Sequence, residues 1–172
     1  MNTTDAQNAS EYHWHAIYTC PRSEKKVHKI LEENGIEVYL PLQKRLRQWK
    51  DRKKWVEEPL FRSYLFVKVS EKEYYSAINV QGAVRYITFA GKAVKIPERQ
   101  ILSIRQLMES QYNITVTTSQ FKKGDIILIK NGVLVGLEGE MISYLGKKRI
   151  LMRIQQLSCS LIVEVPLTDL AE

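Results

Sequence analysis

The chain has 172 residues, of which 44% are hydrophobic and 26% are charged. This composition is typical of a folded protein and excludes a disordered chain, and the length allows one ordinary domain or two small ones. No apolar run approaches the roughly 20 residues of a membrane helix, and the polar N-terminus does not have the pattern of a signal peptide. We therefore expect a cytoplasmic protein without a membrane contact, preceded by a disordered tail at residues 1–12.

The net charge of +7 is concentrated in one segment. Residues 44–54 contain seven Lys or Arg and one Asp, a net charge of +6, which leaves only +1 for the rest of the chain. Such a local cluster points to contact with a polyanion. The two cysteines, Cys20 and Cys159, are far apart in the sequence and predict free thiols. No motif predicts a metal site or a cofactor.

The first part of the sequence predicts a strand, a helix and a second strand. Residues 14–19 predict a strand, and Ser23 is a suitable N-cap for a helix whose apolar stripe includes Val27 and Leu31. An Asn-Gly pair ends this helix, and residues 36–40 predict the second strand.

The basic segment that follows has no apolar face at either the strand or the helix period, which predicts an exposed ribbon or loop. As a strand, it would place Arg45, Arg47, Trp49, Lys53 and Trp55 on one face. Bases that alternate with aromatic residues suit phosphate neutralisation combined with stacking on unpaired bases. The alternative is an ordinary solvated hairpin. The candidate nucleic-acid-binding residues of this segment are Lys44, Arg45, Arg47, Trp49, Lys50, Arg52, Lys53 and Lys54.

Residues 60–69 predict a strand that is apolar on both faces. Alternation places Phe61 with Leu65 and Val67 on one face, and Tyr64 with Phe66 on the other. A short helix, a strand at 84–89 and a longer helix from residue 97 follow. Residues 13–110 thus predict an α+β domain, a sheet with helices packed on it.

Residues 111–120 are rich in Thr, Ser, Asn and Gln and predict an interdomain linker. Residues 121–172 then contain five short strand patterns with glycines at the bends. This pattern is typical of a small closed all-β barrel.

Several of these motifs resemble the NusG family of transcription elongation factors. Trp14-His-Ala-Ile-Tyr-Thr19, Glu24-Lys-Lys-Val27 and Tyr64-Leu-Phe-Val67 are similar to the family's N-terminal domain. Lys123-Gly-Asp and Gly136-Leu-Glu-Gly139 resemble the KOW motif of its C-terminal, SH3-like barrel. The basic segment before Pro59-Leu-Phe61 is similar to the UpxY branch, specialised RfaH-related paralogues that act as antiterminators of polysaccharide operons.

The resemblance implies a monomeric transcription factor whose N-terminal domain binds the β′ clamp helices of RNA polymerase and can touch the non-template DNA strand. The sequence leaves open whether the KOW domain binds Rho, a ribosomal protein, the N-terminal domain or nothing. The clamp-helix surface carried over by position is Tyr18, Phe61, Tyr64, Phe66 and Tyr86. Arg22 and Lys25 occupy the place of the family's DNA contacts. Strand parity puts Phe61 on the opposite face unless a bulge at Arg62-Ser63 resets the register.

We therefore expect a non-enzymatic factor that suppresses pausing and termination on a polysaccharide-biosynthesis operon. No arrangement of nucleophile and base or of paired carboxylates predicts an enzyme. The alternative is a KOW-type RNA-binding or ribosome-associated protein. Against it, residues 122–170 hold seven bases and five acids, which is only mildly positive.

Overall fold

The computed structural model describes residues 11–145 and 147–165. The predicted tail at 1–12 thus falls mostly outside the described residues, as do the last residues of the predicted barrel. The chain forms two compact units, residues 1–98 and 99–172, and each is described here by itself. None of the helices in the described part has both the length and the apolar character of a membrane span.

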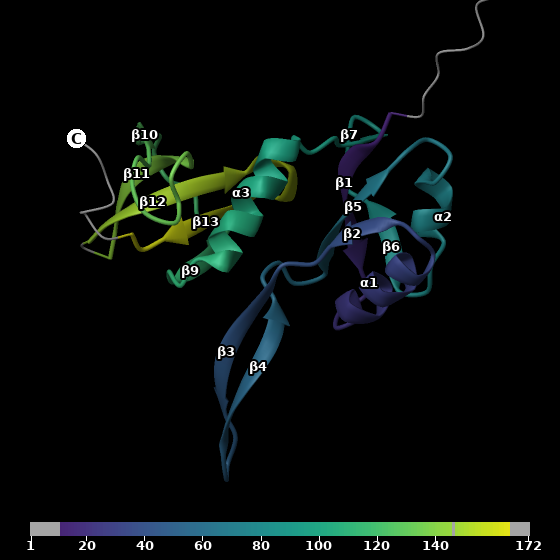
Figure 1. The fold of residues 1–172 in the computed structure, drawn as a ribbon, viewed down its shortest axis with the longest axis horizontal. Helices are drawn as coiled ribbons and strands as arrows, with labels where there is room; N and C mark the ends of the chain where they lie inside the picture. The colour runs from purple at the N-terminus through teal and green to yellow at the C-terminus, as the bar shows by residue number, and fades with distance from the viewer. Residues whose placement is uncertain (1–10, 146, 166–172) are drawn as a thin grey trace, which may run out of the picture. The chain divides into compact units, whose positions relative to one another are not determined.

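The first unit is built on a four-stranded antiparallel sheet (Figure 1). Its strands are β1 (His13–Thr19), β2 (Glu37–Tyr39), β5 (Tyr64–Val69) and β6 (Ala83–Tyr86). They lie in the order β2-β5-β1-β6, so the two longest strands occupy the centre of the sheet. The predicted strand at 14–19 is confirmed as β1.

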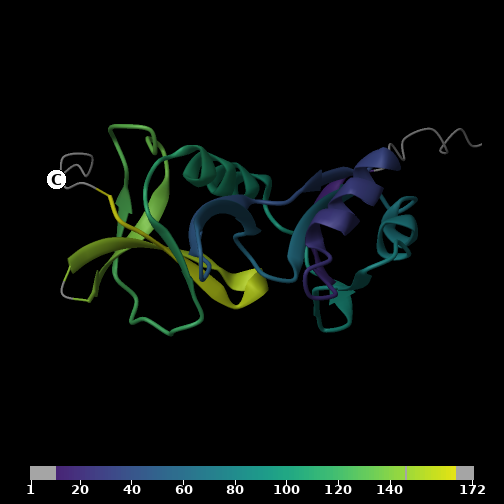
Figure 2. The same cartoon turned by 90° about the horizontal axis from the view of Figure 1, so that it is seen from below.

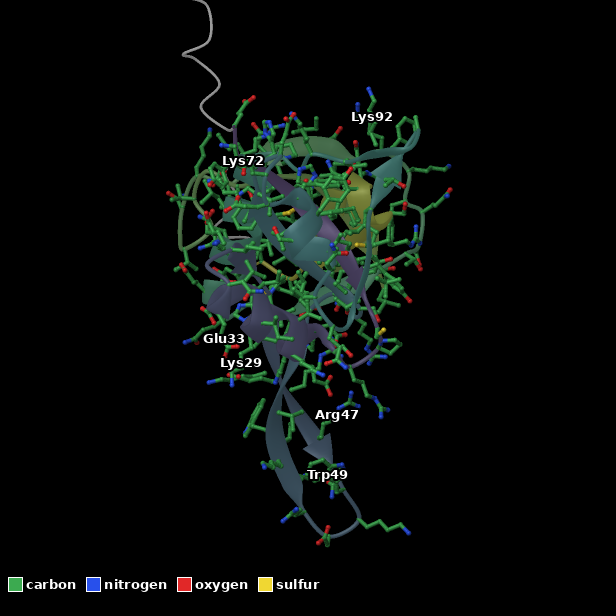
Figure 3. All side chains as sticks on the ribbon, turned by 90° about the vertical axis from the view of Figure 1, so that its right-hand side faces the viewer. Lys29, Glu33, Arg47, Trp49, Lys72 and Lys92 are labelled. Atoms are coloured by element: carbon green, nitrogen blue, oxygen red, sulfur yellow. The ribbon has the colours of Figure 1, made fainter. Side chains whose placement is uncertain are left out.

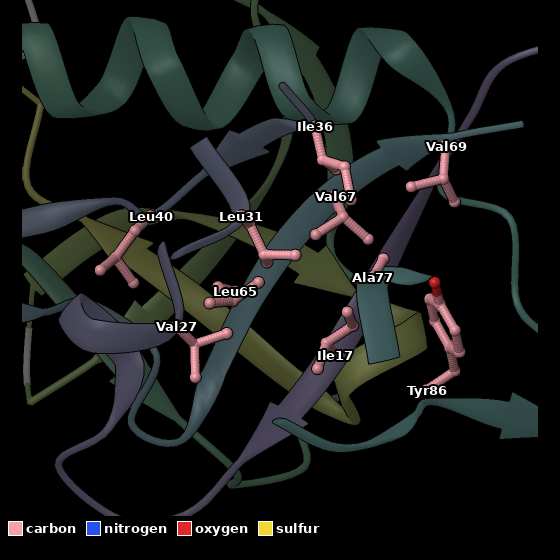
Figure 4. Packing of buried hydrophobic residues seen from close by; sticks show 10 residues of the cluster. All are labelled: Ile17, Val27, Leu31, Ile36, Leu40, Leu65, Val67, Val69, Ala77 and Tyr86. Carbon is pink, nitrogen blue, oxygen red and sulfur yellow. The ribbon is translucent and has the colours of Figure 1, made fainter. Parts of the chain in front are cut away.

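Two helices, α1 (Glu24–Glu33) and α2 (Tyr74–Ile78), cover one face of this sheet. Val27 and Leu31 of α1 and Ala77 of α2 pack on strand residues of that face in one buried cluster (Figure 4). The stripe predicted for α1 is therefore its packing face, because positions four apart lie on the same side of a helix. Ile17, Leu65 and Val67 supply the strand side of the cluster.

The basic segment forms a separate two-stranded antiparallel ribbon, made of β3 (Leu42–Gln48) and β4 (Lys53–Pro59). We call residues 42–59 the basic ribbon. It leaves the sheet after β2 and returns to β5, and the Leu60 amide donates to the Pro41 carbonyl at 2.8 Å across its base (Figure 1). A second small hairpin joins β7 (Thr88–Phe89) to β8 (Lys92–Ala93).

The second unit combines helix α3 (Glu98–Glu109) with a five-stranded antiparallel sheet. The sheet order is β10-β11-β12-β13-β9, and a 3₁₀ turn, η1 (Gln155–Leu157), joins β12 to β13. The strands are β9 (Ile114–Thr117), β10 (Asp125–Leu128), β11 (Glu138–Tyr144), β12 (Lys147–Ile154) and β13 (Cys159–Val163). Figure 2 shows how strongly these green-to-yellow strands curve.

Helix α3 belongs to this second unit, whereas the sequence placed it in the first domain. Its Gln100 amide donates to the Arg153 carbonyl at 3.1 Å, and its Gln106 amide donates to the carbonyls of Val133 and Val135 at 3.0 Å. The apolar stripe of a helix predicts that the helix packs, but it does not say against which sheet.

Two further predictions for this region are corrected. The linker expected at 111–120 contains strand β9, in which Ile114 and Val116 alternate with threonines and pair with β13. The closed barrel is instead an open sheet, because among the described residues β9 and β10 stand at opposite ends of the strand order and do not pair. The polar composition of the segment obscured a two-residue alternation of β-branched side chains.

Candidate functional site

The face of the first sheet opposite α1 and α2 carries aromatic side chains. Residues directly opposite each other in an antiparallel pair share a face, and β1 and β5 place Tyr18 opposite Tyr64 and Ala16 opposite Phe66. The rings of Tyr18 and Tyr64 meet edge to face, with centroids 5.4 Å apart. We call Tyr18, Tyr39, Phe61, Tyr64 and Phe66 the aromatic face.

A turn before β5 places Phe61 on this face. The predicted strand from residue 60 begins only at Tyr64, because Ser63 has a φ of +62° and the Tyr64 amide donates back to the Phe61 carbonyl at 3.3 Å. The Phe61 ring then packs edge to face on Phe66, with centroids 5.8 Å apart. The reset of register that the sequence left open therefore occurs.

The carboxylate of Glu24 holds this turn. It is buried, and its Oε1 accepts the Ser63 amide at 2.7 Å, while the Ser63 carbonyl accepts the Thr19 amide at 2.8 Å. The positive φ of a non-glycine residue is unfavourable by itself, so the turn depends on such bonds. Sequence reasoning placed Glu24 in a helix motif but missed this contact, which spans 39 residues.

Members of the aromatic face differ in exposure. Tyr18 and Tyr64 are half-buried, whereas Phe61 and Phe66 are 3% and 0% exposed. The ring of Phe66 also stacks on Tyr39, with centroids 6.2 Å apart. The two tyrosines are therefore the predicted residues of this face that remain accessible.

The prediction that Tyr86 belongs to the same surface is wrong. It stands opposite Ile17 on the helix-covered face and is part of the buried cluster. Its hydroxyl donates to the Tyr74 carbonyl at 2.7 Å, and its ring stacks on Tyr74. Burial, together with the neighbouring Tyr74, raises the pKa of Tyr86 above its ordinary value. The alternation of side chains along β6 does not by itself show which of its two faces lies on the helix-covered side of the sheet.

Arg85 borders the aromatic face, and the predicted DNA contacts Arg22 and Lys25 lie at the start of α1. Arg85 is exposed, stands opposite Tyr18 and places its guanidinium 5.7 Å from the centre of that ring. Sequence reasoning missed it, since only the pairing of β1 with β6 brings the two together. Arg22, predicted as a DNA contact, is exposed in the turn before α1 with a φ of +64°. Lys25 follows on α1, and its ammonium donates to the Glu57 carbonyl of the basic ribbon at 2.8 Å.

The basic ribbon is exposed as predicted, but its residues divide differently between the two faces. Gln48 pairs with Lys53 and Arg45 with Val56, so odd-numbered residues of β3 share a face with even-numbered residues of β4. The expectation that Arg45, Arg47, Lys53 and Trp55 share one face is therefore wrong. It assumed one continuous strand, whereas the chain reverses at residues 49–52.

One face of the ribbon, the tryptophan face, carries Lys44, Leu46, Lys53, Trp55 and the acidic Glu57. The other, the arginine face, carries Arg45, Arg47, Lys54 and Val56. At the tip, the Trp49 amide donates to the Arg52 carbonyl at 2.8 Å, and the Arg52 guanidinium lies 5.7 Å from the Trp49 ring centre. Lys50 is exposed beside them. In Figure 3, Arg47 and Trp49 lie on a ribbon that extends beyond Lys29 and Glu33 of α1.

Comparison with known proteins identifies the class of protein to which this two-unit chain belongs. A family model described as "Transcription termination factor nusG" matches residues 12–105, more than half of the chain. The chain therefore belongs to the NusG family of transcription elongation and antitermination factors.

Individual relatives agree with this assignment. The chain is 27% identical over 139 residues to a Chlamydia pneumoniae protein named "Transcription termination/antitermination protein NusG", covering 74% of this chain and 76% of the relative. A solved structure titled "Domain interaction in Thermotoga maritima NusG" is 20% identical, covers 93% of this chain and 96% of its own, and superposes with a TM-score of 0.55. At that identity, the structure supports the fold alone.

Proposed function

We propose that the chain is a transcription antitermination factor that binds RNA polymerase and suppresses pausing and termination on a polysaccharide-biosynthesis operon. Membership of the NusG family supports the general role. The observation that carries the polymerase contact is the half-buried pair Tyr18 and Tyr64, which lies on the sheet face opposite α1 and α2. Accessible aromatic residues are enriched at protein interfaces because they bury a large area.

The mechanism needs no chemistry from this chain. A protein that binds the elongating state of the polymerase more tightly than the paused state shifts the equilibrium by the ratio of the two affinities and by no more. Tyr18 and Tyr64 bind the clamp helices in this proposal, with Phe61 and Phe66 packed beside them. Arg22 and Lys25, at the start of α1, contact the displaced non-template DNA strand.

The second unit has a candidate surface for a further protein partner. Ile126 and Leu128 are 67% and 47% exposed on β10, and Val133 and Val135 are 62% and 54% exposed in the loop that follows. Gln106 of α3 fixes that loop through both valine carbonyls. Exposed apolar residues on a strand and on the loop that follows it are candidates for a docking site. Rho or a ribosomal protein is the partner that we assign to it.

Transcription in vitro tests the proposal. With the cognate polymerase on a long leader template, saturating protein should shorten pauses and increase read-through at terminators. Unchanged pausing and termination would contradict it. Co-purification with ribosomes in the absence of polymerase would instead favour the RNA-binding, ribosome-associated alternative.

A further inference from the structure

We infer that the tryptophan face of the basic ribbon binds an unpaired nucleic acid strand, with Trp55 as the stacking platform. This goes beyond the proposed function, because it concerns a ligand that the isolated protein binds without polymerase. The inference rests on the geometry of Lys44, Leu46, Lys53 and Trp55.

The ribbon exposes apolar area that the fold does not use. Trp55 is 66% exposed and Leu46, directly opposite it on β3, is 49% exposed. The two strands of the ribbon pair only with each other among the described strands, so neither outer edge of the ribbon is extended by a further strand. An exposed Trp and Leu on neighbouring strands form one apolar platform, which is unfavourable in water unless a ligand covers it.

The charges of the two faces are engaged differently. On the arginine face, Arg47 donates to both carboxylate oxygens of Glu58 at 2.8 and 2.9 Å, and Arg45 donates to the Gln43 side chain at 3.1 Å. On the tryptophan face, Lys44 stands directly opposite Glu57, and neither Lys44 nor Lys53 has an ion pair among the described residues. Lys54 of the arginine face has none among them either, so the difference between the faces lies in the two engaged arginines. The ammonium groups of Lys44 and Lys53 are thus available to a phosphate beside the Trp55 ring.

The site has room and a second cationic border. An open hollow of about 570 Å³ is lined by Lys44, Trp55 and Glu57 of the tryptophan face and by Val56, which the register places on the arginine face. The ammonium of Lys25, which reaches the Glu57 carbonyl from α1, adds a cation next to this hollow. Lysines along an aromatic platform match the repeating phosphates and bases of a single strand.

The geometry selects an unpaired strand over a duplex. Stacking on an indole needs a base face that is not already covered by its neighbours, and every base has such a face once it is unstacked. A duplex would meet only the lysines, through its phosphates. Both DNA and RNA single strands have this chemistry, so the experiment includes each.

The test is fluorescence anisotropy of labelled oligonucleotides with the full chain. Single-stranded DNA, single-stranded RNA and duplex DNA of equal length are titrated separately. We expect at least one single strand to bind more tightly than the duplex, which identifies the strand type. Trp55→Ala should weaken that binding roughly 5- to 150-fold, and Trp55→Tyr should restore most of it, since a smaller ring still stacks.

Two neighbouring cations provide the matched control. Lys44→Gln removes a charge from the tryptophan face and should lower the slope of log K against log salt by about 0.7, the single-strand value per phosphate. Arg45→Gln removes the same charge from the other face and should have the smaller effect. Equal loss from both variants, equal affinity for the duplex, or an unchanged affinity of Trp55→Ala would each overturn the inference.

Discussion

The four-stranded sheet and the basic ribbon lie in the same unit and are both antiparallel, yet they use aromatic and apolar residues in opposite ways. In the sheet, Ile17 and Leu65 are 0% exposed and pack under α1. In the ribbon, Trp55 is 66% exposed, and the two ribbon strands pair with no other described strand. The buried apolar residues of the sheet therefore stabilise the fold, and Leu42 at the base of the ribbon packs against them. Leu46 and Trp55 further along the ribbon remain exposed to a ligand.

The largest expected effect separates these two roles directly. Leu65→Ala should lower the free energy of unfolding by about 2–5 kcal/mol, because it leaves a cavity in the buried cluster. Trp55→Ala should change it by less than about 0.5 kcal/mol, because the exposed indole has little packing to lose. Urea denaturation of both variants measures the contrast. A destabilisation of Trp55→Ala that approaches that of Leu65→Ala would show that the ribbon is part of a core.

A smaller effect tests the turn that joins the ribbon to the sheet. Glu24→Ala removes the acceptor of the Ser63 amide and should cost about 1–3 kcal/mol, the penalty for a buried amide without a partner. Glu24→Gln keeps a carbonyl oxygen at the same place and should retain most of the stability. Equal denaturation midpoints for the Ala and Gln variants would show that the carboxylate does not hold the turn.

The smallest effect is a dependence on pH that is specific to the sheet. Burial lowers the pKa of His15, whose Nδ1 lies 2.9 Å from the Val94 carbonyl. The unfolded state therefore binds the proton more readily, so stability is full above the unfolded pKa near 6.5 and falls as the pH drops below it. His15→Asn, whose amide can donate to the same carbonyl, should flatten the pH profile of urea denaturation below pH 6.5. If the pH profile of His15→Asn is as steep as that of the unmodified protein, the loss of stability at low pH comes from titratable groups other than His15.

Local patterns in the sequence predicted the elements and most of their packing. The stripe of Val27 and Leu31, the strand at 14–19 and the exposure of the basic ribbon are all set by short-range periodicity. The errors come from long-range pairing. Tyr86 faces the core and Trp55 stands apart from Arg45 because strand register, not parity within one segment, decides which side chains share a face.

The same cause explains the missed residues of the site. Arg85 and Glu24 act on partners 67 and 39 residues away, at Tyr18 and Ser63. The boundary between the units also differs from the predicted one, since α3 groups with the second unit and not with the first domain. The apolar stripe of a helix does not indicate which sheet the helix packs against. Phe61 joins the aromatic face only through the turn at Ser63, whose positive φ is not encoded by a glycine.

The central claim is that the aromatic face binds RNA polymerase, and equilibrium binding of the full chain to the cognate core enzyme tests it most directly. Tyr64→Ala should weaken binding at least tenfold and remain folded, because the ring is only half-buried on the aromatic face. Tyr12→Ala removes an exposed tyrosine outside that face and should bind as the unmodified protein does. Equal affinity of the Tyr64 and Tyr12 variants would contradict the account.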